Sequence, residues 1–253
     1  MIKENLIKIW VQSIKNINLY IKKGPVVIFG LMFPFFMALS WVLGRNISIN
    51  QIFIGITAMT TFFTATAISP VVLPIETREK SLERILSAPL SLNQILLGIV
   101  VASALYSLII TSLIAMIFII IFPSLFNSLI SAFILWLGII LMSILGSLLG
   151  LLVAAHPTDQ TSDVMLIMNL IKFPLLFISG IFIPLDLLPF SAVILSFFSP
   201  LSFLTDLFRY CVDGHSFFPY QIDLLILIIW IIVLFIVNAY IHSKTMPKRF
   251  EEK

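Results

Sequence analysis

The sequence IETREKSLERILSAPLSLNQ, residues 75–94, is a charged stretch between two long apolar segments. It carries three of the 15 Lys and Arg residues and three of the 12 Asp and Glu residues. The whole chain of 253 residues is 60% hydrophobic and only 11% charged, whereas about a quarter of an ordinary soluble domain is charged. The composition therefore predicts an all-α integral membrane protein with several spans, in which this stretch is a short loop at the membrane surface.

Side-chain spacing predicts a helix inside this loop. Glu76 and Lys80 are spaced as an i,i+4 helical pair, and Leu82, Ile85 and Leu86 form an apolar stripe. A solvated linker is the alternative, but a linker does not need apolar residues at helical spacing. We therefore expect a short amphipathic helix whose charges face the cytosol and whose apolar stripe faces the bilayer.

Residues 2–23 are predicted to form an amphipathic helix in the membrane interface. The alternative is a soluble helix packed on a partner, but an apolar segment follows immediately. The apolar face consists of Ile2, Leu6, Trp10, Ile14, Ile17 and Ile21, and the polar face of Glu4, Lys8, Gln12, Lys15 and Lys22.

An apolar helix needs about 20 residues to cross the hydrocarbon core. The spans predicted by this measure are Val26–Leu43, Ile52–Leu73, Ile95–Phe122, Leu129–Ala155, Val164–Ile183 and Leu224–Ile241. A further apolar stretch, Leu187–Leu204, contains Pro189 and Pro200, which disfavour a continuous helix. We expect it to form short re-entrant helices within an outer element over residues 184–220.

The positions of the basic residues favour six spans over seven. Twelve of the 15 Lys and Arg residues lie in residues 1–23, 75–94 and 242–253. The positive-inside rule places these three regions, and so both termini, in the cytoplasm, which requires an even number of spans. We expect a multi-pass protein of the plasma membrane with outer loops Gly44–Gln51, Pro123–Ser128 and Pro184–Asp223 and an inner loop His156–Asp163.

The sequence lacks the motifs of several enzyme classes. It has no GxxxxGK[ST] phosphate loop, no HExxH and no Ser-His-Asp candidate set, and its three His are scattered. We therefore predict no catalytic residue, no metal site and no cofactor in this chain, and nothing favours nucleic acid as a partner. If transport consumes energy, another polypeptide supplies it.

Polar side chains inside the spans are candidates for a substrate pathway. Thr57, Thr61 and Thr64 share a face of the second span, although such hydroxyls more often bond to the carbonyl four residues back. Lys172 is the one charge inside a span and costs roughly 3 kcal/mol there, so it should face protein or water. It lines a pathway, pairs with an acid of an adjoining subunit, or reaches toward the interface.

Small residues recur every four positions in the fourth predicted span, at Gly146, Gly150 and Ala154. This spacing lets a second helix approach closely. The second helix belongs either to another subunit or to the same subunit, and we favour the same subunit.

Three motifs resemble those of the ABC-2 type permeases, the six-span membrane subunits of ABC exporters. They are ETREKSLERILSAPLS at 76–91, FPLLFISGIFIPLDLLP at 173–189 and SPLSFLTDLFR at 199–209. With the N-terminal helix and the basic tail, the resemblance covers nearly all of a single membrane domain over residues 1–253. One departure is Lys80, where family members commonly have Gly.

The resemblance implies an exporter subunit that dimerises with a second copy or a paralogue and contacts a separate ATPase, which binds ATP and Mg²⁺. The loop at 75–94 would be the coupling helix that the ATPase moves, and membrane lipid surrounds the spans. The rivals are an ATP-independent carrier and a non-transporting assembly or immunity protein. The implied coupling residues are Glu76, Arg78, Glu79, Leu82, Glu83, Ile85, Leu86 and Pro89, and the implied outer-gate residues are Ser179, Gly180, Pro184, Pro189, Pro200 and Arg209.

Overall fold

The computed structural model describes residues 2–43, 46–126, 128–247 and 249, and these residues contain helices and no strand. The prediction of an all-α fold is confirmed for them. Parts of the predicted loops Gly44–Gln51 and Pro123–Ser128 and of the basic tail 242–253 lie outside the described residues. The α-helices are α1 (Ile2–Tyr20), α2 (Gly24–Val27), α3 (Phe33–Val42), α4 (Ile49–Ala65), α5 (Ser69–Arg78), α6 (Ser81–Ser87), α7 (Leu92–Ile121), α8 (Leu129–Val153), α9 (Thr161–Phe177), α10 (Phe190–Ser196), α11 (Pro200–Asp213) and α12 (Tyr220–Thr245).

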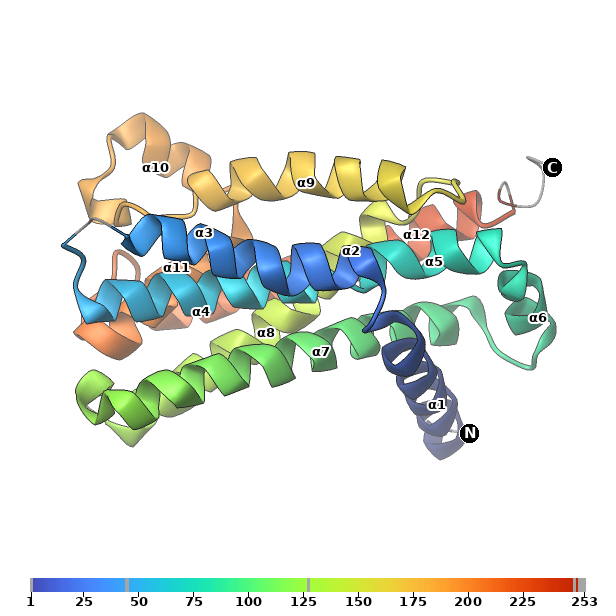
Figure 1. Ribbon diagram of the computed structural model, residues 1–253, viewed down its shortest axis with the longest axis horizontal. Coiled ribbons are helices and arrows are strands. Elements are labelled where there is room, and N and C mark those ends of the chain that lie inside the picture. The colour runs from blue at the N-terminus through green and yellow to red at the C-terminus, as the bar shows by residue number, and fades with distance from the viewer. Residues whose placement is uncertain (1, 44–45, 127, 248, 250–253) are drawn as a thin grey trace.

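The long helices form one elongated bundle, and α6 and the end of α12 lie at the same end of it (Figure 1). Short irregular helices complete the chain: a π-helical turn, η1 (Ile28–Met32), joins α2 to α3, while η2 (Pro123–Leu125) and η3 (Leu185–Leu187) are 3-10 turns. α1 leaves the bundle axis and crosses beside α7, the helix with which it packs (Figure 1).

Four helical segments of the described chain are long and apolar enough to cross a membrane. They are Ile49–Arg78, Leu92–Ile121, Leu129–Val153 and Tyr220–Thr245, and a fifth follows if the bent pair α10–α11 counts as one span. The chain is therefore a multi-pass membrane protein. Two predicted spans differ from this set, because η1 interrupts residues 26–43 and because α9 has only 17 residues.

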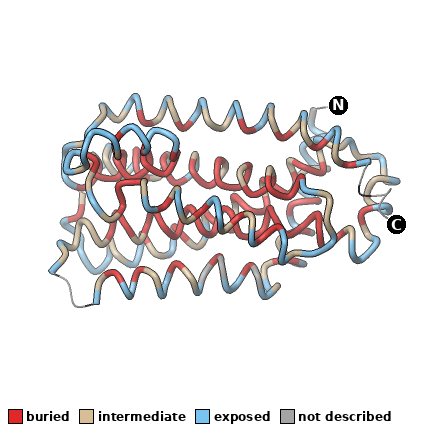
Figure 2. Tube along the Cα trace, turned by 90° about the horizontal axis from the view of Figure 1, so that it is seen from above, coloured by how far each residue is buried: buried red, intermediate tan, exposed pale blue. Residues whose placement is uncertain are grey.

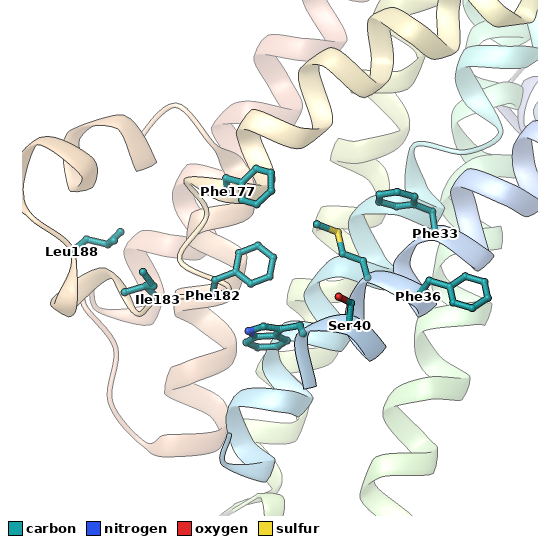
Figure 3. A pocket seen from close by; sticks show the side chains of 9 residues that line it. Phe33, Phe36, Ser40, Phe177, Phe182, Ile183 and Leu188 are labelled. Atoms are coloured by element: carbon teal, nitrogen blue, oxygen red, sulfur yellow. The ribbon is translucent and has the colours of Figure 1, made fainter. Parts of the chain in front are cut away.

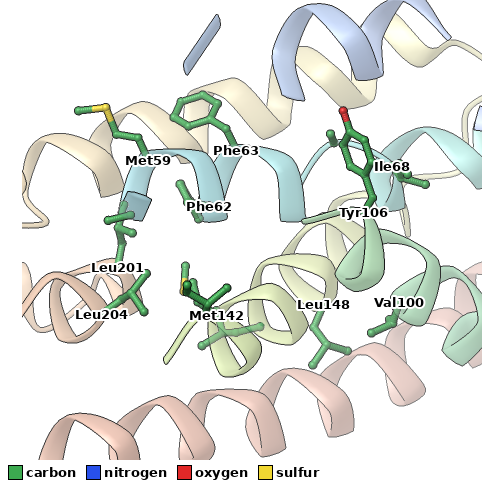
Figure 4. Packing of buried hydrophobic residues seen from close by; sticks show 14 of the residues in the cluster. Met59, Phe62, Phe63, Ile68, Val100, Tyr106, Met142, Leu148, Leu201 and Leu204 are labelled. Carbon is green, nitrogen blue, oxygen red and sulfur yellow. The ribbon is translucent and has the colours of Figure 1, made fainter. Parts of the chain in front are cut away.

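The segment α4–α5 forms the centre of the bundle. In the most apolar stretch of 18 residues in this segment, 89% is buried, whereas 17% of the corresponding stretch of α12 is buried. Figure 2 shows the same pattern, with buried residues concentrated in the middle of the bundle. Phe62, Phe63 and Ile68 of this segment belong to one core cluster with side chains of α7, α8 and α11 (Figure 4).

The outer element predicted for residues 184–220 contains two helices that meet at an angle of 105°. Pro189 caps α10 and Pro200 lies in the first turn of α11, where the missing N–H of a proline costs nothing. α11 is almost completely buried and packs on α4, α8 and α12. Its N-terminal end is covered by protein, as an interrupted helix at membrane depth requires, whereas Asp213 and Gly214 at its C-terminal end are exposed.

Candidate functional site

The charged stretch forms a hairpin of two helices at one end of the bundle (Figure 1). α5 continues the buried segment as far as Arg78, so Glu76 and Arg78 extend the long helix instead of belonging to the short one. The chain turns at Glu79 and Lys80, and α6 follows with Glu83 and Arg84 exposed. Pro89 lies exposed beyond the end of α6.

The expected ion pair between Glu76 and Lys80 is wrong. Lys80 lies outside both helices, and Glu76 is only 1% exposed and instead accepts from Lys15 Nζ at 2.5 Å. The Tyr20 hydroxyl donates to the same Glu76 oxygen at 3.2 Å. Burial raises the pKa of Tyr20 and the Glu76 carboxylate raises it further, so the phenol stays protonated as a donor.

The apolar stripe of the hairpin does not face the bilayer as predicted. Leu82 is 1% exposed and belongs to the core cluster, against which Ile85 and Leu86 also pack. Burying a leucine side chain of this kind contributes about 2 kcal/mol. The stripe therefore anchors α6 to the protein and leaves the charged side outward.

α1 turns its polar side toward the bundle. Gln12, Ser13 and Asn16 are buried, whereas Leu6 and Trp10 of the predicted apolar face are more than half exposed. An apolar surface turned away from the protein is suited to lipid, as predicted for an interfacial helix. A second ion pair, Lys23 Nζ to Glu79 Oε1 at 3.5 Å, joins the end of this segment to the hairpin turn.

The threonines proposed for a pathway are buried, and two of them bond within their own helix. Thr61 Oγ1 donates to the Thr57 carbonyl at 2.7 Å, and Thr64 Oγ1 donates to the Thr60 carbonyl at 2.5 Å. Thr64 also lies 3.0 Å from Ser107 Oγ of α7. The first two bonds satisfy the hydroxyls locally, and the contact with Ser107 joins α4 to α7.

Lys172 is fully buried on α9 and points at the interruption between α4 and α5. Its Nζ donates to the Thr66 carbonyl at 3.3 Å and lies 5.3 Å from the centre of the Phe63 ring. Gly146 and Gly150 of α8 face the same interruption, because a Cβ on Gly150 would lie 2.2 Å from Ser69 Oγ. These small residues make a contact inside one subunit, as favoured from the sequence.

At the opposite end of the bundle, α11 satisfies the carbonyl end of α9. Arg209 Nη2 donates to the Gly180 carbonyl at 2.6 Å, and Thr205 Oγ1 donates to the Ser179 carbonyl at 2.5 Å. Gly180 has φ +75°, a conformation that closes the end of the helix. The motif residues Ser179, Gly180 and Arg209 thus meet, while Pro184 and Pro189 begin the short helices that follow.

Residues 5–212 match the family described as ABC-2 type transporter. The chain belongs to this family. No protein of curated function matches it. As a member of the ABC-2 transporter family it is a transporter permease component without catalytic machinery of its own, and the hairpin, the interruption and the α9–α11 end all lie within or directly beside the matched residues.

Lys80 occupies a left-handed conformation, with φ 54° and ψ 19°. This geometry explains why glycine fits the turn, because a side chain there crowds the backbone. We expect Lys80→Gly to raise the free energy of unfolding by about 0.5–1 kcal/mol, since the left-handed penalty exceeds the entropy that glycine adds to the unfolded chain. Thermal unfolding of the purified protein in detergent measures this change.

Lys80→Ala is the control for the charge, because it removes the ammonium but keeps the Cβ. An equal gain from both variants would mean that the charge, and not the backbone conformation, sets the cost.

Sequence reasoning missed several residues that build these contacts. Lys15 and Tyr20 hold Glu76, and Ser103 of α7 bonds at the interruption. Arg249 donates to the carbonyls of His156 at 2.8 Å and Thr158 at 3.0 Å and so fixes the loop before α9. The four-residue spacing of Ser103 and Ser107 is the signal that could have found the Ser103 contact.

Proposed function

We propose that this permease is the membrane subunit of an ATP-driven exporter and that a separate ATPase subunit moves the α5–α6 hairpin. The observation that carries the proposal is the anchoring of the hairpin. Its charged side is exposed, and Glu79 on it is paired with Lys23, while Leu82 and Glu76 connect the hairpin to the core and to α1. A force applied to α6 therefore acts directly on α5 and on the central segment of the bundle.

The proposed topology has six spans, with both termini and the hairpin in the cytoplasm of a plasma-membrane protein. α2–α3 and α9 supply the two spans beyond the four long ones, and both run along the bundle in Figure 1. Two features support the orientation. α6 and the end of α12 share one end of the bundle, and the basic residues concentrate in the same parts of the chain.

The proposed cargo is an apolar or amphipathic molecule that passes beside an aromatic hollow. A cavity of about 720 Å³ lies between α3 and the residues around the end of α9. Figure 3 shows Phe33, Phe36 and Ser40 on one side and Phe177, Phe182 and Leu188 on the other. Aromatic walls with few polar groups are typical of sites for apolar ligands. A second permease subunit would close the open side of this hollow.

One of the two rival functions considered from the sequence, an ATP-independent carrier, depends on Lys172. In the structure this ammonium is already bound to a backbone carbonyl. The geometry thus favours a role for Lys172 in holding helices together, and the ATPase-driven function remains the proposal.

Charge reversal on the hairpin tests the proposed coupling. In a complex with the cognate ATPase, we expect Glu79→Lys and Glu83→Lys to lower export by about tenfold, because they change the charge of the surface that the ATPase meets. ATP hydrolysis in the same vesicles should continue without export. Both rates are measured in proteoliposomes with a fluorescent apolar cargo.

His215→Glu is the matched control, since His215 is exposed and lies just beyond the end of α11. It should leave both rates at the wild-type level. Wild-type export by both hairpin variants would remove the basis for the coupling role, and export without any ATPase would favour the carrier.

A further inference from the structure

The central apolar segment is interrupted where it is completely buried. α4 ends at Ala65 and α5 begins at Ser69, and Thr66, Ala67 and Ile68 between them are 0% exposed. The end of a helix leaves carbonyl groups without partners in the helix, and an unsatisfied carbonyl in an apolar surrounding costs several kcal/mol. An interruption at this depth therefore requires partners from other helices.

Side chains from α7, α8 and α9 supply those partners. Ser103 Oγ donates to the Ala65 carbonyl at 2.7 Å and accepts from Ser69 N at 3.3 Å, so one hydroxyl bridges the two half-helices. Lys172 Nζ donates to the Thr66 carbonyl at 3.3 Å. The Ala65 carbonyl also accepts from Ser147 Oγ of α8 at 3.3 Å, so the side-chain bonds gather on Thr66 and on the two residues that flank the interruption.

Lys172 is suited to this position by its charge. The carbonyl end of a helix carries a partial negative charge, and α4 ends directly at the Lys172 ammonium. The face of the Phe63 ring, 5.3 Å away, also attracts a cation. These two contacts offset part of the cost of burying this group on α9.

The two halves of the segment are held differently. α4 is tied sideways by a chain of hydroxyls, in which Thr64 Oγ1 and Ser143 Oγ each lie 3.0 Å from Ser107 Oγ. α5 packs against Gly150 of α8, carries the hairpin at its far end and is linked to α1 through Glu76. A displacement of the hairpin would therefore meet a fixed α4 at the interruption.

We infer that residues 66–68 form a hinge between α4, the fixed outer half of the segment, and α5, the movable inner half. Lys172 is the positioning residue that keeps α4 in place. The inference rests on the proposed function in so far as the ATPase supplies the displacement. A few residues at the ends of helices are where domain motions concentrate their changes in φ and ψ. Lys172 links that point to α9, which lines the aromatic hollow.

The distance across the hinge tests the inference in the permease alone. Spin labels are placed on the exposed positions Asn46→Cys and Ser87→Cys, in a Cys211→Ala background that removes the native thiol. The full-length protein is studied in lipid nanodiscs by pulsed electron paramagnetic resonance. We expect Lys172→Met to broaden the distribution of label distances at least about twofold, because the end of α4 loses its anchor on α9.

Asn238→Leu is the matched control, because Asn238 also donates from a buried side chain to a carbonyl of α8, at 3.0 Å, away from the hinge. It should lower the unfolding temperature and leave the distribution narrow. Ser103→Ala provides a second hinge variant and should broaden the distribution in the same direction. A narrow distribution in both hinge variants, or equal broadening in Asn238→Leu, would overturn the inference.

Export measurements separate this inference from the proposed function. With the ATPase present, Lys172→Met should hydrolyse ATP at the wild-type rate and export about tenfold more slowly. Wild-type export by Lys172→Met would refute the positioning role. A wild-type complex that neither hydrolyses ATP nor exports would refute the proposed function, while the label distances would still decide whether the hinge exists.

Discussion

Gly150→Leu is expected to destabilise the folded protein by about 3 kcal/mol, because the contact that it enlarges has no free space. A Cβ at this position would lie 2.2 Å from Ser69 Oγ and 3.0 Å from Pro70 Cδ, and the proline ring cannot rotate away. Leucine is a good helix former, so the loss arises from packing and not from helix propensity. Thermal unfolding in detergent and the monodisperse fraction after purification measure the effect.

Gly24→Leu is the control, since nothing lies within 4 Å of a Cβ built at Gly24. It should change the unfolding temperature little. If Gly150→Leu were as stable as the wild type, α8 would have to move away from the interruption without cost, and the close packing of the two elements would not be a determinant of the fold.

The second large effect is an asymmetry in the ion pair between α1 and α5. We expect Lys15→Met to cost about 2 kcal/mol and Glu76→Leu to cost less. Removing one partner of a buried pair leaves the other charge uncompensated, and Glu76 is 1% exposed while Lys15 is 31% exposed. When Glu76 is removed, Lys15 can turn toward water. The partial exposure of Lys15 is also why the expected cost of Lys15→Met lies below the usual range for fully buried ion pairs.

Lys8→Met is the control, because it makes the same substitution in an ion pair at the surface of α1, where Lys8 Nζ lies 3.2 Å from Oε1 of the exposed Glu4. Its expected cost is within about 0.5 kcal/mol. Denaturant unfolding of the three variants gives the order directly. A larger loss for Glu76→Leu than for Lys15→Met would show that the packing of the glutamate side chain outweighs its charge.

The sequence predicted the features that depend on the composition of whole segments. The charged stretch at 75–94, the amphipathic N-terminal helix and the proline-limited helices after Pro189 all follow from runs of many residues whose preferences agree. The family motifs added the association of residues 173–189 with residues 199–209, and the bonds from Arg209 to Gly180 and from Thr205 to Ser179 lie between those two motifs.

Features that depend on single contacts were not predicted. The position of the interruption before Pro70 is one of them, since the helix continues through Pro74 to Arg78. Lys172 stood out as a charge, yet its partner is a backbone carbonyl, which every residue has and which no pattern can single out. The spacing of Glu76 and Lys80 predicted an ion pair within one helix. Glu76 instead pairs with Lys15, 61 positions away, because the chain turns left-handed at Lys80.

The two sides of α9 are held by different kinds of contact and so permit different movements of the helix. Toward α11, the end of the helix is joined by directional hydrogen bonds, which break or hold as discrete units. Toward α3, the contacts are between aromatic rings, with Phe33 and Phe173 at 5.3 Å and Trp41 and Phe182, beyond the helix end, at 5.5 Å. Rings can slide past one another at nearly constant contact area. The end of α9 should therefore stay joined to α11, and the side next to α3 is the face along which α9 can shear.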